Sequence, residues 1–181
     1  MPRARGERVS RGMSLVSLAP LGHSHADAML RWTSDAEVRD NLGLRRVATR
    51  EGTEAWLTRA LSDDTVRAFA IHRDGEHVGN VVLDRIDRHV GTTRLHIYIG
   101  DAAVRGHGVG ARATALAVKY AFDELGLHKV WLTVHAKNGR AIAAYARAGF
   151  HVEGVLRDEF ILGGERVAAV YMGCVRTDRV S

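Results

Sequence analysis

Residues 104–126 read VRGHGVGARATALAVKYAFDELG, a glycine-rich cluster followed by a long segment with apolar residues at helical spacing. Gly106, Gly108 and Gly110 remove Cβ atoms from the turn that leads into this predicted helix. Three interpretations are open for the cluster. The cluster binds either a phosphate-bearing cofactor or a nucleotide of another kind, or else it is only a tight turn between a strand and a helix.

The segment before the cluster predicts a strand. In TTRLHIYIG, residues 92–100, apolar and polar side chains alternate, with Leu95 and Ile97 on one face and Arg94 and His96 on the other. The turn therefore lies inside a mostly antiparallel series of strands and not after the first strand of a βαβ unit. That position disfavours a dinucleotide-binding fold.

The rest of the chain divides into segments with the helical period of about 3.6 residues and segments with the strand period of two. Asp74-Gly75 predicts the turn of a hairpin, and Ser34 with Glu37 fits a capping box at a helix start. Helices are expected at residues 23–32, from about 34, at 49–61 and at 138–149. Strands are expected at residues 14–18, 65–73, 76–86, 128–135, 150–162 and 165–175.

Composition predicts one cytoplasmic domain. The chain has 181 residues, 46% of them hydrophobic, which suits a single core; we expect the domain at residues 13–177, with a disordered basic arm at 1–12 and a tail at 178–181. Met1 and Met13 are both candidates for the first residue. No apolar run is long enough for a membrane span, and no signal peptide is visible. Cys174, the one cysteine, suits a buried strand position.

The net charge of +5 does not predict a nucleic-acid partner. The first 13 residues contribute +3, from four arginines and one glutamate, and the body is nearly balanced. No aromatic residues interleave with the arm to form a stacking platform.

Two of the phosphate-binding motifs that the cluster suggests require a residue that this chain lacks. A P-loop needs a lysine after the last glycine, and none is present. A dinucleotide fingerprint can be drawn through Gly108, Gly110 and Ala113, but no acidic residue follows about 20 positions on. The remaining motif uses consecutive backbone N–H groups at the start of a helix, which can surround a diphosphate.

RGHGVG, residues 105–110, resembles the R/Q-x-x-G-x-G/A motif of the GNAT superfamily of N-acetyltransferases. Downstream, Asn138, a tyrosine seven residues later, the Gly149-Phe150 pair and the final hairpin resemble the RimJ/RimL-type and spermidine N-acetyltransferase branch. The resemblance covers about residues 13–177. It implies an α/β fold, a mixed and mostly antiparallel twisted sheet flanked by helices, with splayed central parallel strands.

The same resemblance implies acetyl-CoA as the acetyl donor and a set of binding residues. The strand and the glycine turn would bind pantetheine and diphosphate, and Asn138 would contact the pantetheine arm. The implied cofactor-binding residues are Ile97, Ile99, Arg105, Gly106, His107, Gly108, Val109, Gly110, Ala111 and Asn138. Outside the resemblance, Asn138 also suits a plain helix N-cap.

Tyr145 is the implied proton donor to the leaving CoA thiolate; the alternative is an aromatic residue of the core. Many relatives carry a glutamate where this chain has Arg94, and arginine cannot accept a proton. His96, on the same strand face, is therefore the candidate base. Trp32, Glu37 and Arg94 are the candidates for contact with the acceptor. His23 and His25 lack further ligands at metal spacing, so no metal is expected.

The predicted activity is direct transfer of an acetyl group from acetyl-CoA to a primary amine, carried by a small molecule or a protein N-terminus. The alternative is a non-catalytic acyl-CoA-binding or regulatory module of the same fold. The resemblance also implies a homodimer, since relatives often dimerise.

Overall fold

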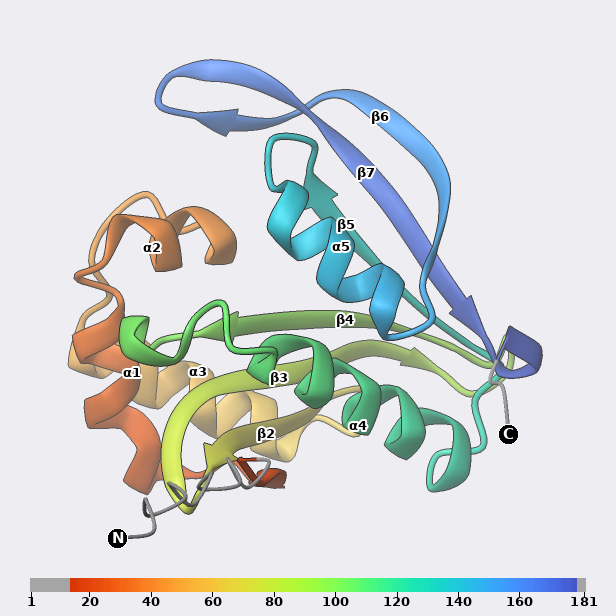
Figure 1. Cartoon of the computed structure of the whole chain (residues 1–181). Coiled ribbons are helices and arrows are strands. Elements are labelled where there is room, and N and C mark those ends of the chain that lie inside the picture. Colours follow the sequence, from red (N-terminus) through yellow and green to blue (C-terminus); the bar gives the residue numbers. More distant parts are fainter. Residues whose placement is uncertain (1–13, 179–181) are drawn as a thin grey trace, which may run out of the picture.

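The computed structural model describes residues 14–178, so the predicted arm at 1–12 and nearly all of the predicted tail lie outside the described residues. Seven strands form one sheet in the order β1-β2-β3-β4-β5-β7-β6, and β4 with β5 is its parallel pair (Figure 1). The strands are β1 Val16–Pro20, β2 Arg67–Arg73, β3 Glu76–Asp87, β4 Thr92–Ile99, β5 Lys129–His135, β6 His151–Leu162 and β7 Glu165–Val175. The predicted fold class, a mixed and mostly antiparallel sheet flanked by helices, is confirmed.

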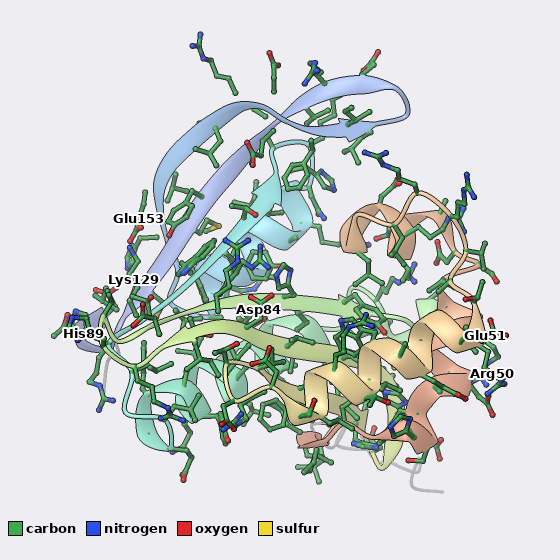
Figure 2. The ribbon with its side chains drawn as sticks, turned by 180° about the vertical axis from the view of Figure 1, so that it is seen from behind. Arg50, Glu51, Asp84, His89, Lys129 and Glu153 are labelled. Atoms are coloured by element: carbon green, nitrogen blue, oxygen red, sulfur yellow. The ribbon has the colours of Figure 1, made fainter. Side chains whose placement is uncertain are left out.

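Helices cover both faces of the sheet. α4 (Val109–Asp123) and α5 (Gly139–Arg147) pack on one face, while α1 (Ala26–Trp32) and α3 (Arg50–Ser62) pack on the other (Figures 1 and 2). Strand alternation supplies a core to each face, because adjacent residues of β2 point to opposite sides. Ile71 belongs to the core under α4, and Ala70 to the smaller core that contains Leu57 of α3.

α2 (Ala36–Leu42) lies beyond the end of β4, opposite α5 (Figure 1). Its N-cap corrects the sequence prediction. Asp35, and not Ser34, occupies the cap, and its Oδ1 accepts the N–H of Glu37 at 2.9 Å. Both residue types cap helices well, so the pattern located the helix start within one residue.

Two other boundaries differ from the prediction. The helix expected at residues 23–32 begins with a 3₁₀ turn at His23–His25 before α1. The first strand includes Pro20 at its end, which a strand at the edge of the sheet tolerates because proline lacks only a donor. The hairpin turn predicted at Asp74-Gly75 is confirmed, with φ of 52° and 90°, as a two-residue primed turn requires.

Candidate active site: a cleft between diverging strands

The cleft opens where β4 and β5 part. The two strands pair only at three positions, from Thr92 with Lys129 to Arg94 with Trp131. Beyond these, β4 stays paired with β3 as far as Ile99, and β5 stays paired with β7 as far as His135. Within residues 14–178, the inner edges of both strands therefore have no strand partner along the cleft, and backbone groups there remain available to a ligand. The predicted splay of the parallel pair is confirmed.

The start of α4 borders this gap. Gly108 is its N-cap and provides no side-chain cap, and the first intrahelical bond runs from the Arg112 N–H to the Gly108 carbonyl at 3.1 Å. The amides of Gly108 through Ala111 therefore have no acceptor within the helix. They carry the positive end of the helix dipole, which favours an anion.

Different constraints explain why the three positions of the turn are glycine. Gly106 and Gly108 have φ of 81° and 78°, a left-handed conformation that explains each glycine without a ligand. Gly110 lies in the helix with no such φ, and a Cβ there would meet only Ile99 at an ordinary 3.9 Å. Since a helical glycine costs about 1 kcal/mol relative to alanine, neither packing nor backbone explains it. Gly110 lines the cleft, where a bare backbone allows close approach of a ligand.

α5 forms the opposite wall. Asn138 is its N-cap, as the sequence predicts, and its Oδ1 accepts the N–H of Ala141 at 3.0 Å. Tyr145 lies two turns further on and lines the cleft, with its ring centroid 6.0 Å from that of Phe150. Burial raises the pKa of the Tyr145 phenol to about 12. At neutral pH the phenol is protonated, which is the form that can donate a proton to a leaving thiolate.

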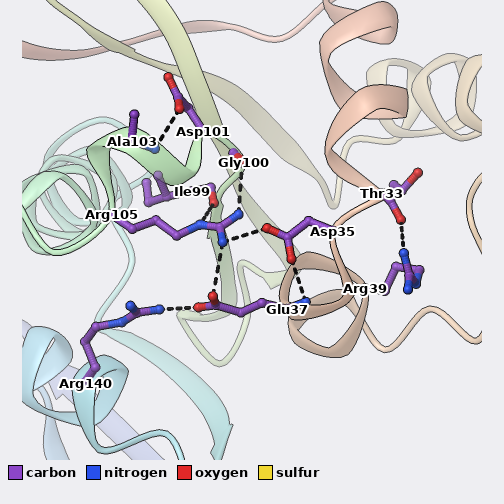
Figure 3. Close-up of polar contacts among 10 residues, drawn as sticks. All are labelled: Thr33, Asp35, Glu37, Arg39, Ile99, Gly100, Asp101, Ala103, Arg105 and Arg140. Carbon is purple, nitrogen blue, oxygen red and sulfur yellow. Dashed lines mark hydrogen bonds and ion pairs between the residues drawn. The ribbon is translucent and has the colours of Figure 1, made fainter.

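Arg105 is a structural clamp (Figure 3). Its Nε and Nη2 donate to the carbonyls of Ile99 and Gly100 at 2.9 and 3.0 Å. Its Nη1 lies 2.7 Å from Asp35 and 3.1 Å from Glu37, and the side chain is only 13% exposed. The hydrogen bond from Arg105 lowers the pKa of Asp35. Every nitrogen of the guanidinium thus has an acceptor on β4 or α2, and the side chain joins the end of β4 to α2.

Arg94 is paired within the sheet. Its Nε and Nη2 bind the two oxygens of Asp84, opposite it on β3, at 2.9 and 2.7 Å. Figure 2 shows Asp84 on the sheet face away from α4. His96 Nε2 lies 3.4 Å from the same carboxylate. Burial alone would raise the Asp84 pKa, but the contacts with Arg94 and His96 hold it well below its usual value of 3.8. Asp84 thus neutralises the arginine and faces Nε2 of His96.

The structure brings most of the predicted site residues to one cleft of about 210 Å³. The predicted residues that line it are Glu37, His96, Ile97, Ile99, Arg105, Gly106, Gly108, Gly110, Ala111, Asn138 and Tyr145. The side chains of four predicted residues do not line it, although the backbone N–H of Val109 belongs to the first turn of α4. Val109 is buried in the core, His107 is exposed, and Arg94 pairs with Asp84. Trp32 is buried against Gly100, where a Cβ would lie 1.9 Å from its ring.

Sequence reasoning missed several residues of the cleft. Arg140, at the start of α5, contacts Glu37 across it, and His135 lies at the end of β5. Asp84 supports His96 from the neighbouring strand. No local motif marks these three, since each matters through a partner distant in sequence. Asp40, on the same helix as the predicted Glu37, also lines the cleft.

The described residues lack both a metal-binding cluster and a membrane-spanning helix. Across residues 14–178, no group of three or more His, Cys, Asp or Glu side chains is arranged to hold a metal ion. Within the same span, every helix is too short or too polar to cross a membrane.

Comparison with known proteins identifies relatives of this chain. The family model described as "Acetyltransferase (GNAT) domain" matches residues 16–151. The spermidine N(1)-acetyltransferase of Escherichia coli (strain K12) is 37% identical over 112 residues, which cover 62% of this chain and 60% of the relative. The probable N-acetyltransferase YjcK of Bacillus subtilis (strain 168) is 35% identical over 91 residues, half of each chain. The chain thus spans 50–60% of the length of these relatives.

Solved structures agree on the fold. The spermidine N-acetyltransferase from Vibrio cholerae, crystallised with CoA and spermine, superimposes with a TM-score of 0.84 at 21% identity, over 90% of this chain and 96% of that one. A likeness at this identity concerns the arrangement of the backbone.

Proposed function

Because the chain belongs to the acetyltransferase (GNAT) domain family, we propose that it transfers an acetyl group from acetyl-CoA directly to a primary amine. The single observation that carries this proposal is the cleft between β4 and β5, bordered by the uncapped start of α4. It offers free strand edges to an extended pantetheine chain and free helix amides to a diphosphate.

The start of α4 and the end of β4 bind different parts of acetyl-CoA. The amides from Gly108 to Ala111 bind the diphosphate, and the bare backbone of Gly110 lets it approach. The β4 segment from Ile97 to Ile99 binds pantetheine and supplies a backbone N–H to the thioester oxygen. Acetyl-CoA supplies the activated acetyl group, and the residues of this chain position it.

Proton transfer uses one group on α5 and one on β4. Tyr145 donates to the departing thiolate, since burial keeps its phenol protonated. His96 accepts the proton of the attacking amine through Nδ1, while Asp84 holds Nε2. Arg94 takes no part in proton transfer, because Asp84 binds it.

The second candidate, a non-catalytic acyl-CoA-binding module, is favoured by one observation. The family resemblance implies a carboxylate base early on this strand, and this chain has Arg94 there. Turnover separates the two candidates, because the module would bind CoA without releasing thiol in the presence of any amine.

The proposal extends to partners and location. The acceptor is a small-molecule amine or a peptide N-terminus, and the protein acts in the cytoplasm. A homodimer is part of the same proposal, since β6 is an edge strand with exposed apolar side chains at Val152, Val155 and Ile161. One relative, the spermidine N-acetyltransferase from Vibrio cholerae, has a structure described as dodecameric.

The test is a thiol-release assay across four amine classes: a peptide N-terminus, a polyamine, an amino sugar and a drug-like amine. We expect acetyl-CoA-dependent thiol release with at least one class. Calorimetry with CoA and acetyl-CoA is the parallel measurement. No binding heat at millimolar concentration would overturn the proposal, and binding without release would support the module.

A further inference from the structure

The segment between β4 and the glycine turn is closed by a side chain of its own. Arg105 Nε and Nη2 donate to the carbonyls of Ile99 and Gly100 at 2.9 and 3.0 Å (Figure 3). Between these carbonyls and the arginine, the chain makes a single 3₁₀ turn at Ala102–Val104. The Arg105 side chain therefore ties the end of β4 to the residue that immediately precedes Gly106, the first glycine of the turn.

Carboxylates of α2 hold the same guanidinium from the other side. Arg105 Nη1 lies 2.7 Å from Asp35 and 3.1 Å from Glu37. Because the arginine side chain is only 13% exposed, its charge needs a close counter-charge, which the two neutral carbonyls do not supply. Asp35 Oδ2 contacts Arg105, while its Oδ1 accepts the Glu37 N–H at 2.9 Å. Asp35 is therefore held at both oxygens, and it sets the position of the guanidinium.

α2 is itself fixed to the sheet and to α1, so its carboxylates have a defined position. Val38 is 1% exposed and packs in a small core with Trp32 and Tyr98. Arg39 Nη1 donates to the carbonyl of Thr33 at 2.6 Å (Figure 3). These contacts make α2 a rigid support for Asp35, and through Asp35 for the segment that leads to the glycine turn.

We infer that Asp35 strengthens the binding of CoA although it is anionic and does not contact CoA. It is a positioning residue: it holds Arg105, and Arg105 fixes the path of the chain into the turn whose amides bind the diphosphate. A site that is already in its binding conformation loses less conformational freedom when the ligand binds, which increases affinity. The inference rests on the proposed function, because it requires the diphosphate to bind at the start of α4.

Two other interpretations of the same contacts predict the opposite sign. If only charge matters, a carboxylate near an anion-binding site repels the anion, so a neutral residue at position 35 should tighten CoA binding. If the Arg105 side chain itself binds the diphosphate, loss of a competing carboxylate frees the guanidinium and should also tighten binding. Only support of the turn through Asp35 and Arg105 predicts weaker binding when the carboxylate is neutralised.

Asp35→Asn is the first test, with CoA binding measured by calorimetry. Asparagine caps helices as well as aspartate does, so the start of α2 is kept. We expect the Kd for CoA to rise about fivefold, because Arg105 loses a close charged partner. An unchanged or lower Kd would overturn the inference.

Asp40→Asn is the matched control. Asp40 is on the same helix and lines the cleft, but within residues 14–178 its carboxylate has no arginine or lysine partner. The substitution removes the same charge without touching Arg105, so the Kd for CoA should stay within about twofold of the wild-type value or fall. A rise equal to that in Asp35→Asn would contradict a specific role for Asp35.

A double-mutant cycle tests whether Asp35 acts through Arg105. Arg105→Lys keeps the positive charge but loses the planar fork that reaches β4 and α2 together. We expect this variant to raise the Kd for CoA about fivefold, and Asp35→Asn to add less than about twofold on that background, because both substitutions break one contact. A Kd within about twofold of wild type in Arg105→Lys, or fully additive effects, would overturn the inference.

Two further readouts separate the inference from a loss of stability and from the proposed function. If Asp35 only stabilises the fold, Asp35→Asn lowers the Tm and the fraction of protein that binds, while the Kd of the folded fraction stays unchanged; that result would overturn the inference. If wild-type protein binds no CoA, the proposed function fails and the inference fails with it. If wild-type protein binds CoA and Asp35→Asn binds it equally well, the inference alone fails.

Discussion

Two helices begin at the same cleft, and their first turns are completed differently. α5 is capped by its own residue, since Asn138 Oδ1 accepts the Ala141 N–H at 3.0 Å. α4 has no side-chain cap, and Gly108 precedes it in a left-handed conformation. A good N-cap is worth about 1 kcal/mol, so α4 forgoes stabilisation that α5 receives. The free amides of α4 therefore suit an external anion, while α5 is fixed by its own cap and positions Tyr145.

The largest effect should come from the chemistry on α5. Tyr145→Phe removes the proton donor but keeps the ring that packs against Phe150. We expect kcat to fall about 100-fold or more, while the Kd for acetyl-CoA changes less than about twofold. Thiol release at saturating substrates and calorimetry measure the two quantities. Weaker binding with kcat unchanged would assign Tyr145 to binding and place no chemistry on α5.

The next effect should come from the binding surface of α4. Gly110→Val places a branched side chain where the diphosphate approaches, at a cost of about 2 kcal/mol or roughly 30-fold in Kd for CoA. Gly139→Val is the matched control in the first turn of α5, where a Cβ meets nothing within 4 Å and the residue does not line the cleft. Valine is a better helix former than glycine, so both variants should fold. Equal affinities in calorimetry would remove the distinction between the two helix starts.

Gly110 is a better probe than Gly108. A side chain at Gly108 would be strained at a φ of 78° whether or not a ligand binds. Loss of CoA binding in a Gly108 variant would therefore not identify the cause, whereas the φ of Gly110 accepts any residue.

A smaller effect should separate the two roles of Asn138. Asn138→Ala should lower the free energy of unfolding by about 1 kcal/mol, because the Ala141 N–H loses its acceptor. Asn138→Asp keeps that acceptor and removes the Nδ2 donor. Urea unfolding and CoA calorimetry on both variants decide the roles. If only the alanine variant changes, Asn138 is a cap alone; if CoA affinity falls in both, the amide also binds pantetheine.

Local patterns predicted the parts of the site that are local in sequence. The glycine turn, the Asn138 cap and the position of Tyr145 two turns on all follow from short spacings. Strand alternation also placed Arg94 and His96 on one face of β4. Such patterns depend only on backbone geometry within one element, so they can be predicted without the tertiary structure.

Pairings between elements were not predictable. The partner of Arg94 shows why, because β3 and β4 shift register between Asp84 and Asp87. Counting back from the pair Asp87–Thr92 would put Arg85 opposite Arg94, but Arg85 adopts a φ of 50° and the irregularity brings Asp84 there instead. An arginine predicted to contact the acceptor is therefore neutralised by a carboxylate that no spacing rule locates.

The smallest expected effect is a flat pH profile, and it tests both helix starts together. Burial raises the pKa of Tyr145 to about 12, so its phenol keeps the proton as pH rises and remains a donor well above pH 8. The backbone amides of α4 do not titrate in this range. We therefore expect kcat at saturating amine, and the Kd for acetyl-CoA, each to change less than about twofold between pH 8 and pH 10. A kcat that falls about tenfold per pH unit above pH 9, with Kd constant, would show that the proton donor has a much lower pKa than the Tyr145 phenol, and the role given to α5 would pass to another residue.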